Sequence, residues 1–294
     1  MLCTIVGLSA RTFILTLLAM IAFASNSLLC RAALKQTSID AASFTFLRIC
    51  SGAIALWPII NVRRSTRAIC LRVDGNWISA LSLFLYAAAF SFAYVDVAAG
   101  TGALLLFGSV QATMIVWGLH KGENLRVIQI LGVVVAVVGL VVLLFPGLSA
   151  PPLFGSILML GAGMAWGIYS LRGKSEKNPA SVTAGNFVRA VPFAAAVSFI
   201  FVSRIHLDVA GAAYAIVSGA ITSGVGYVIW YSALPSLKAA SAATVQLSVP
   251  VLAATGGILL LGEPLTLRYV VASVAILGGI ALVVLEKDSR VLQR

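Results

Sequence analysis

Aromatic residues recur at helical spacing in two apolar stretches of the chain. Tyr86, Phe90 and Tyr94 follow one another every four residues, and so do Tyr227 and Tyr231 in a later stretch. Residues four apart share one face of an α-helix, and the later stripe repeats the earlier one at an offset of 141 residues. Because aromatic rings stack on planar apolar groups, we predict a small-molecule site on these faces. Its predicted aromatic lining is Tyr86, Phe90, Tyr227 and Tyr231.

Polar amides form a second group of candidates. Asn26 lies near the middle of an apolar stretch, and Gln111 and Gln246 lie inside two others. An amide in an apolar medium must find hydrogen-bond partners, because an unpaired polar group there costs several kcal/mol. Each amide therefore either joins two helices or contacts the ligand, and both interpretations stay open. We add to the predicted site Asn26, Gln111 and Gln246, with Trp166 and Tyr169 from the stretch that corresponds to that of Asn26.

Two arginines lie inside apolar stretches at matching positions. Arg48 and Arg189 are also 141 residues apart, each seven or eight positions beyond the start of its stretch, roughly 10–12 Å along a helix. A charge at that depth is costly, although a long arginine side chain can reach back towards water. We predict a structural or gating role for both arginines, and for Pro250 as a helix kink. Attraction of a ligand carboxylate by one arginine is the alternative.

Residues suited to catalysis or metal binding are sparse. Cys3, Cys30, Cys50 and Cys70 form no CxxC pair, and the two histidines lie far apart in the sequence. The sequence has no phosphate-binding glycine loop and no pair of carboxylates inside an apolar stretch. We therefore predict that the protein is not an enzyme, needs no cofactor and has no metal site.

Composition indicates a protein that spans a lipid bilayer many times. Hydrophobic residues make up 61% of the 294 residues and charged residues only 10%, against roughly 25% charged residues in a soluble domain. Mean hydropathy is +1.06. The net charge of +11 comes mostly from Lys and Arg in short loops, which argues against nucleic acid as a partner.

Ten stretches approach the roughly 20 apolar residues that a spanning helix needs. We predict an all-α polytopic membrane protein whose first span is retained rather than cleaved as a signal peptide. The predicted spans are 12–34, 41–62, 75–95, 98–119, 126–145, 152–171, 181–203, 209–232, 237–261 and 266–285. Packing, or for rings near span ends an interfacial belt, is the alternative explanation of the aromatic stripes. The belt is the predicted role of Trp57 and Trp77.

Basic residues predict the orientation. Fourteen of the 20 Lys and Arg residues lie in the terminal segments and in loops on their side of the membrane, and the opposite loops hold Arg31, Lys35, Arg204 and Arg268. Positively charged loops stay inside, so we predict that both termini and the loop at 61–74 are cytoplasmic.

The chain also repeats itself. Gly122-Glu123-Asn124-Leu125 follows the fourth span and Gly262-Glu263-Pro264-Leu265 follows the ninth, and the 17-residue spacing of Arg31 and Arg48 recurs at Arg172 and Arg189. Five spans in each half place the halves in opposite orientations, which is the inverted repeat of many transporters. We predict repeats at 1–148 and 149–294 within one integrated membrane domain.

These features resemble one known family. The spans divide five and five, a Gly-Glu turn follows the fourth and ninth, the ninth opens with Ala239-Ala240-Ser241-Ala242-Ala243 and contains Pro250, and the last is rich in glycine. This pattern resembles the EamA-type members of the drug/metabolite transporter superfamily. The stretch from Gly100 to Gln111 is similar to the subgroup that contains the YddG-type aromatic amino-acid exporters. One departure is Val110, which stands in the first repeat where Pro250 stands in the second.

The resemblance implies a bacterial inner-membrane exporter of amino acids or similar metabolites that works by alternating access. The duplicated aromatic stripe favours aromatic or hydrophobic amino acids. All nine acidic residues lie at predicted span ends or in loops, and proton or sodium relays usually place a carboxylate at mid-membrane, so we expect downhill, uncoupled transport. The alternatives are a non-transporting scaffold with the same fold and an exporter of other drugs or metabolites.

Overall fold

The computed structural model describes residues 10–62, 74–122, 124–147, 150–173, 176, 178–237 and 239–289. The predicted cytoplasmic loop falls almost entirely outside these ranges, as do Glu123 of the first Gly-Glu turn and the cysteines Cys3 and Cys70.

The described residues form ten helical segments and no strand. Nine segments are long and apolar enough to cross a membrane, and the 17-residue α3 is slightly shorter. Eight are single helices: α1 (Ala10–Gln36), α2 (Ala41–Val62), α3 (Trp77–Ala93), α4 (Ala99–His120), α5 (Val127–Leu144), α6 (Leu153–Gly173), α7 (Pro179–Ile200) and α12 (Leu267–Ser289). The predicted ten-helix fold class is therefore confirmed.

The eighth and ninth segments are interrupted. The eighth consists of α8 (Val209–Val217), the π-helix η3 (Ser218–Val225) and α9 (Gly226–Ala233), and the ninth of α10 (Ala239–Gln246) and α11 (Ser248–Leu261). Proline has no N–H to give to the carbonyl four residues earlier, and Pro250 stands near the start of α11, just beyond the break at Leu247. The corresponding α4, which has Val110 at this position, is unbroken. As predicted, only the second repeat has the break.

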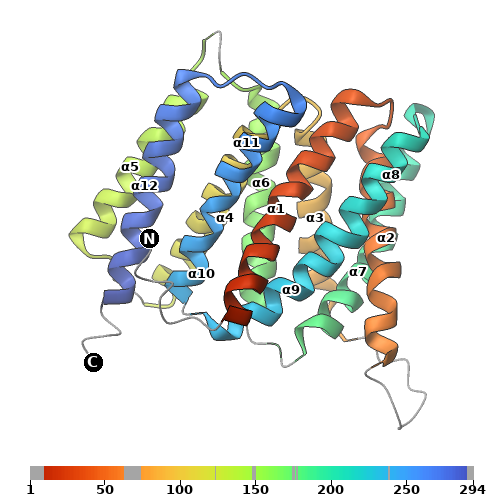
Figure 1. Ribbon diagram of the computed structural model, residues 1–294, viewed down its shortest axis with the longest axis horizontal. Coiled ribbons are helices and arrows are strands. Elements are labelled where there is room, and N and C mark those ends of the chain that lie inside the picture. Colours follow the sequence, from red (N-terminus) through yellow and green to blue (C-terminus); the bar gives the residue numbers. More distant parts are fainter. Residues whose placement is uncertain are drawn as a thin grey trace.

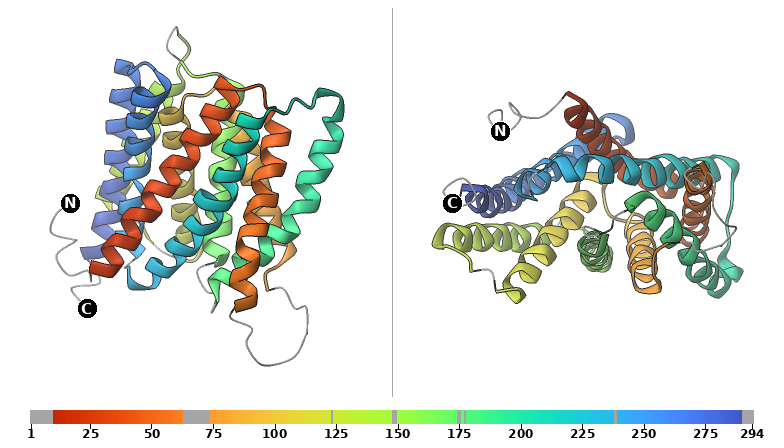
Figure 2. Two further views of the ribbon diagram at one scale, coloured as in Figure 1. Left: turned by 45° about the vertical axis from the view of Figure 1, so that its right-hand side comes forward. Right: turned by 90° about the horizontal axis from the view of Figure 1, so that it is seen from below.

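The helices lie in two layers (Figure 2, right). One layer contains α12, α10–α11, α1, α8–α9 and α2, and the other contains α5, α4, α6, α3 and α7. Within the first layer α1 packs against α9 and α11, and within the second α6 packs against α3 and α4. If each segment is replaced by its counterpart in the other half, the contacts of α1 with α9 and α11 become the contacts of α6 with α3 and α4. The pairs α5–α12, α4–α11 and α2–α7 join the layers and map onto themselves, which is the symmetry of an inverted repeat.

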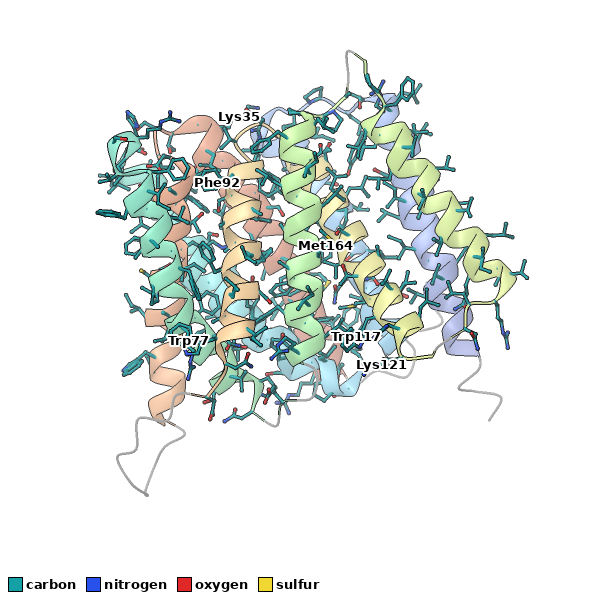
Figure 3. The ribbon with its side chains drawn as sticks, turned by 180° about the vertical axis from the view of Figure 1, so that it is seen from behind. Lys35, Trp77, Phe92, Trp117, Lys121 and Met164 are labelled. Carbon is teal, nitrogen blue, oxygen red and sulfur yellow. The ribbon has the colours of Figure 1, made fainter. Side chains whose placement is uncertain are left out.

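The start of α1 and the end of α12 lie at the same end of the bundle (Figure 1). We call this the terminal end, and we call the other, where α1 connects to α2, the distal end. Aromatic rings lie near both: the exposed Trp77 and Trp117 near the terminal end and the half-buried Phe92 near the distal end (Figure 3). Trp57 and Trp77 are 43% and 58% exposed, so their side chains face outwards, away from the centre of the bundle.

The repeated Gly-Glu turns share one backbone requirement. Gly122 follows α4 with a φ of 86°, and Gly262 follows α11 with a φ of 62°. A Cβ at either position would meet no atom of the described residues within 4 Å beyond its chain neighbours. The left-handed backbone, which L side chains rarely adopt, therefore explains glycine at both helix ends.

Candidate functional site

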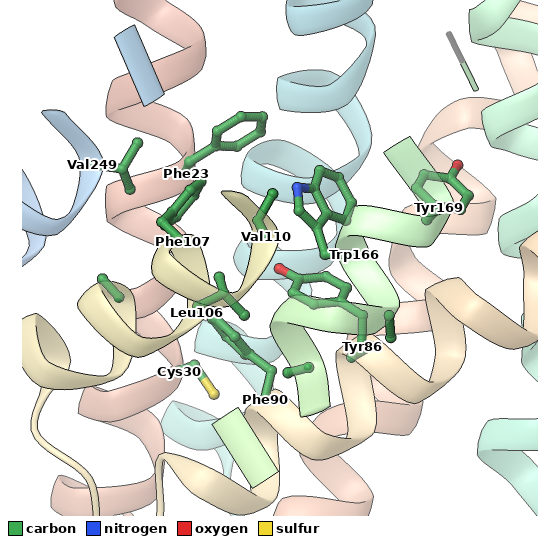
Figure 4. Packing of buried hydrophobic residues seen from close by; sticks show 14 of the residues in the cluster. Phe23, Cys30, Tyr86, Phe90, Leu106, Phe107, Val110, Trp166, Tyr169 and Val249 are labelled. Atoms are coloured by element: carbon green, nitrogen blue, oxygen red, sulfur yellow. The ribbon is translucent and has the colours of Figure 1, made fainter. Parts of the chain in front are cut away.

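A small cavity lies at the centre of the bundle, between the two layers. Its free volume of about 10 Å³ is the room that about one water molecule needs. Residues from α1, α3, α4, α6 and α9 line it: Phe23, Asn26, Ser27, Tyr86, Phe90, Leu106, Phe107, Trp166 and Tyr227. Figure 4 shows several of these side chains converging from their helices.

The ring of Trp166 lies close to several other aromatic rings of the cavity walls. Its ring centroid lies 4.7 Å from that of Tyr227, 5.0 Å from that of Tyr86 and 6.1 Å from that of Phe23. Aromatic pairs at such distances contribute about 0.5–1.5 kcal/mol each beyond area burial. Glycines bring α6 close to α4: a Cβ at Gly163 would collide with the Leu106 carbonyl and Ser109. The cavity is therefore held between closely packed helices.

Asn26 connects α1 to the π-helix and to α3. Its Oδ1 accepts hydrogen bonds from the hydroxyls of Ser218 at 2.7 Å and Thr222 at 3.2 Å, and its Nδ2 donates to the Tyr86 hydroxyl at 3.1 Å. These donors fix the orientation of the amide, with its N–H groups towards Tyr86. Asn26 therefore makes the helix contacts of the first interpretation, and its contact with a ligand stays a prediction.

Arg48 points into the protein rather than back to water. Its side chain is 1% exposed, its Nη2 donates to the Tyr86 hydroxyl at 2.9 Å, and its Nε donates to Ser223 at 3.2 Å. The guanidinium carbon lies 4.8 Å from the ring centroid of Phe90 and 5.2 Å from that of Tyr86. Arg48 thus supports two walls of the cavity from behind.

Arg189, its counterpart in the repeat, has different surroundings. Its Nη1 donates to the carbonyl oxygens of Asp74 and Gly185 near the terminal end. Arg48 and Arg189 therefore have different partners although their sequence positions match.

An ion pair joins the two repeats at the distal end. Arg31 Nε lies 3.0 Å from Glu263 Oε1, and the other oxygen of this carboxylate accepts the N–H of Ala99 at 2.8 Å. Arg31 also donates to the carbonyl oxygens of Tyr94 and Val95 at 2.9 and 2.6 Å. These contacts join α1 and the α3–α4 connection to the end of α11.

Hydrogen bonds from Arg172 to uncharged side chains join the repeats at the terminal end. Arg172, the repeat counterpart of Arg31, donates to Ser79 at 3.0 Å and to Asn76 at 3.1 Å. Asn186 accepts the backbone N–H of Asn76 at 3.0 Å. A second small space of about 10 Å³ lies beside this network, with Tyr169 and Tyr231 in its lining.

The predicted ligand contacts therefore fall into three sets. Asn26, Tyr86, Phe90, Trp166 and Tyr227 line the central cavity, whereas Tyr169 and Tyr231 line the space near the terminal end. Gln111 and Gln246 are buried without lining either space.

Four lining residues were not predicted: Phe23, Ser27, Leu106 and Phe107. Phe23 stands three residues before Asn26, and Ser27 stands four residues after Phe23, so helical spacing could have found both.

Asp40 stabilises the start of α2 at the distal end. Its carboxylate accepts the backbone N–H groups of Ala42 and Ser43 at 2.9 Å and of His206 at 3.0 Å. Burial by itself would raise the pKa of Asp40. The hydrogen bonds to its carboxylate together lower the pKa by more than burial raises it, so the pKa of Asp40 lies below the ordinary value. In the part of the chain that the structure describes, no group of three or more His, Cys, Asp or Glu residues could hold a metal ion.

Two inverted five-segment halves around a central cavity define a secondary-transporter architecture. The model of the EamA-like transporter family matches the chain twice, at residues 10–145 and 153–285. The chain therefore belongs to the EamA-like transporter family. Each predicted half contains one of the two matches.

Known relatives agree with this assignment. An uncharacterized protein of Pseudomonas aeruginosa is 55% identical over 280 residues, which cover 95% of this chain and 96% of that protein. The threonine/homoserine exporter RhtA of Salmonella typhimurium is 34% identical over 162 residues, 52% of this chain and 54% of RhtA. An uncharacterized transporter of Archaeoglobus fulgidus is 24% identical over 94% of this chain and 98% of its own length.

A protein of known crystal structure shares the fold. It has a TM-score of 0.64 and 17% sequence identity, with 92% of this chain and 98% of that chain covered. The finer similarity to the YddG-type subgroup stays a prediction.

Proposed function

We propose that this protein exports amino acids with aromatic or other hydrophobic side chains across the bacterial inner membrane. The carrying observation is the central cavity, which has aromatic walls and a few polar groups at one side. Small-molecule sites commonly combine apolar walls with few polar anchors. In this proposal the substrate side chain stacks between Tyr86, Trp166 and Tyr227. The similarity to a threonine/homoserine exporter supports the amino-acid class.

Transport requires the cavity to open, because a free volume of about 10 Å³ is too small for any amino acid. We assign the described conformation to the occluded state. Two contacts join one repeat to the other: Arg31 to Glu263 at the distal end and Arg172 to Asn76 at the terminal end. In this proposal each contact closes its end of the protein, and we call the two contacts seals. Rocking of the repeats can break one seal while the other stays closed, which is alternating access.

The terminal end is the cytoplasmic side in this proposal, because most basic residues belong to that side of the sequence. The described carboxylates lie at the ends of the bundle, as Asp40, Asp74 and Glu263 illustrate. Without a carboxylate among the described cavity residues, we propose that the substrate gradient alone drives export.

The test is counterflow in liposomes that contain only this protein. Vesicles loaded with unlabelled phenylalanine, leucine or threonine are diluted into labelled phenylalanine. We expect labelled phenylalanine to enter these vesicles faster than protein-free vesicles. Phenylalanine or leucine loaded inside the vesicles should accelerate this entry more than loaded threonine does. If no amino acid accelerates label entry with well-folded protein, the proposed function is wrong. If threonine alone does so, the aromatic part of the proposal is wrong and the amino-acid class stands.

A further inference from the structure

Arg48 is a buried cation without an anionic partner among the described residues. Its contacts in the described residues are the neutral hydroxyls of Tyr86 and Ser223 and the faces of two aromatic rings. One nitrogen of its guanidinium, Nη1, has no hydrogen-bond partner there. An isolated buried charge is expensive, and contact with aromatic faces returns only a part of that cost. A fixed cation kept under such conditions is suited to an anion that arrives from outside.

Donors converge beside this cation. The Tyr86 hydroxyl accepts hydrogen bonds from both Asn26 Nδ2 and Arg48 Nη2, at 3.1 and 2.9 Å. A phenol oxygen is neutral, so a carboxylate oxygen would be a stronger acceptor for the same donors. Tyr86 can also turn its own O–H towards such an anion. Two further cavity atoms, the hydroxyl oxygens of Ser27 and Tyr227, are buried without hydrogen-bond partners in the described structure.

The π-helix holds this arrangement together. Ser223 binds Arg48, and Ser218 and Thr222 bind Asn26, so η3 orients both donors. A Cβ at Gly219 would collide with the Arg48 carbonyl, so only glycine permits this close approach of η3 to α2. π-Helical turns inside helical segments often occur at functional sites.

We propose that Arg48, Tyr86 and Asn26 form the binding site for the carboxylate of the transported substrate. This assignment rests on the proposed function and adds the chemical class: compounds with one carboxylate and no net positive charge. The ammonium group of an amino acid then lies against the faces of Trp166 and Tyr227, which attract cations. Compounds that carry an ammonium group but no carboxylate are repelled by Arg48 and are not substrates.

The experiment compares phenylalanine, 3-phenylpropionate, phenylalaninamide and sodium sulfate as probes of the purified full-length protein. Thermal melting in detergent reports binding, and competition in the counterflow assay reports transport. We expect phenylalanine and 3-phenylpropionate to raise the melting temperature, and phenylalaninamide to compete about 100-fold more weakly than phenylalanine. Equal effects of the amide, equal effects of sulfate, or no stabilisation by either carboxylate would overturn the assignment.

Substitutions of Arg48 test whether this residue binds the carboxylate. Arg48→Gln should abolish the preference for phenylalanine over its amide, and Arg48→Lys, which keeps the charge but loses the planar donor pair, should reduce it about tenfold. Arg204→Gln is the matched control, because Arg204 is exposed at the distal end; it should behave like the parent. A monodisperse Arg48→Gln protein with the parent's preference contradicts the proposal. If Arg48→Gln aggregates, Arg48→Lys and the probe series on the parent decide.

The two proposals can fail separately. Stabilisation by carboxylates without counterflow would leave the carboxylate site intact and reject the transport function. Counterflow in which phenylalaninamide competes as well as phenylalanine would reject the carboxylate site and leave the transport function intact.

Discussion

Substitution of Glu263 by glutamine should loosen the seal at the distal end. The Glu263 side chain is almost fully buried and accepts Arg31 Nε–H at 3.0 Å and Ala99 N–H at 2.8 Å. Glutamine has nearly the same shape but only one acceptor oxygen, so the substitution removes the negative charge and leaves one of these two N–H donors facing its NH2 group. The expected change is a weaker seal in an otherwise intact fold.

The magnitude follows from these hydrogen bonds. A hydrogen bond that involves a charged group contributes about 1.5–3 kcal/mol, and a neutral one about 0.5–1.5 kcal/mol. Glu263→Gln should therefore destabilise the sealed conformations by at least about 1–2 kcal/mol. Because conformations open at the distal end lack this contact, their population should rise about 5- to 30-fold.

Cys30 provides the assay. It precedes Arg31 on α1, is 0% exposed and is labelled in Figure 4. In a variant whose only cysteine is Cys30, a membrane-impermeant maleimide added to intact cells should react about 5- to 30-fold faster after Glu263→Gln. Arg268→Gln is the control, since Arg268 also lies at the distal end but donates to the Phe145 carbonyl in the α5–α12 pair, away from the cavity.

Two results would refute this reasoning. One is an unchanged labelling rate in a well-folded Glu263→Gln protein, and the other is an equal increase after Arg268→Gln. The first would mean that the ion pair does not control access, and the second that loss of any charge at this end loosens the bundle.

Four further predictions follow from the site and the sequence. Trp166→Ala and Tyr227→Ala should weaken apparent substrate affinity at least about tenfold, whereas Trp57→Ala, which removes an exposed ring, should leave it unchanged; the reverse pattern in counterflow would reject the division of the aromatic residues. A cysteine at Ser65, in a cysteine-free background, should escape external maleimide, and strong labelling would overturn the predicted orientation. Counterflow and net uptake should depend little on imposed pH or sodium gradients, and concentrative uptake driven by either ion would contradict uncoupled transport. The folded-state pKa of Asp40 lies below the ordinary value, so ionised Asp40 should stabilise the fold at pH values above its unfolded pKa of about 3.9. That stabilisation should disappear as the pH falls through the lower folded-state pKa. The difference in melting temperature between the parent and Asp40→Asn should therefore shrink at low pH.

The spans and the repeat could be predicted because both depend on local properties. Hydropathy sets the length of a span, and the recurrence of Gly122 and Gly262 at two helix ends reflects one backbone angle. The aromatic stripes were also visible, since Tyr86 and Tyr227 occupy matching positions and both line the central cavity.

The direction of Arg48 could not be predicted from its depth in α2. Its partners, Tyr86 and Ser223, lie 38 and 175 residues away in the sequence, and depth along a helix does not reveal what faces a side chain across the bundle. The π-helix that carries Ser223 was also missed, because a wider helical turn has no hydrophobic period of its own in so short a segment. Repeat symmetry accounts for the position of Arg189 near the terminal end but not for its partners, the carbonyl oxygens of Asp74 and Gly185.

The small central cavity has an electrical consequence. A protein embedded in an energised membrane must not let ions or protons run down the potential while it waits for its substrate. Conduction needs a continuous path of water, and the described cavity has room for about one molecule, with polar contacts closing both ends. A fixed positive charge behind its walls, on Arg48, adds a barrier to cations. We therefore expect this conformation to conduct neither ions nor protons.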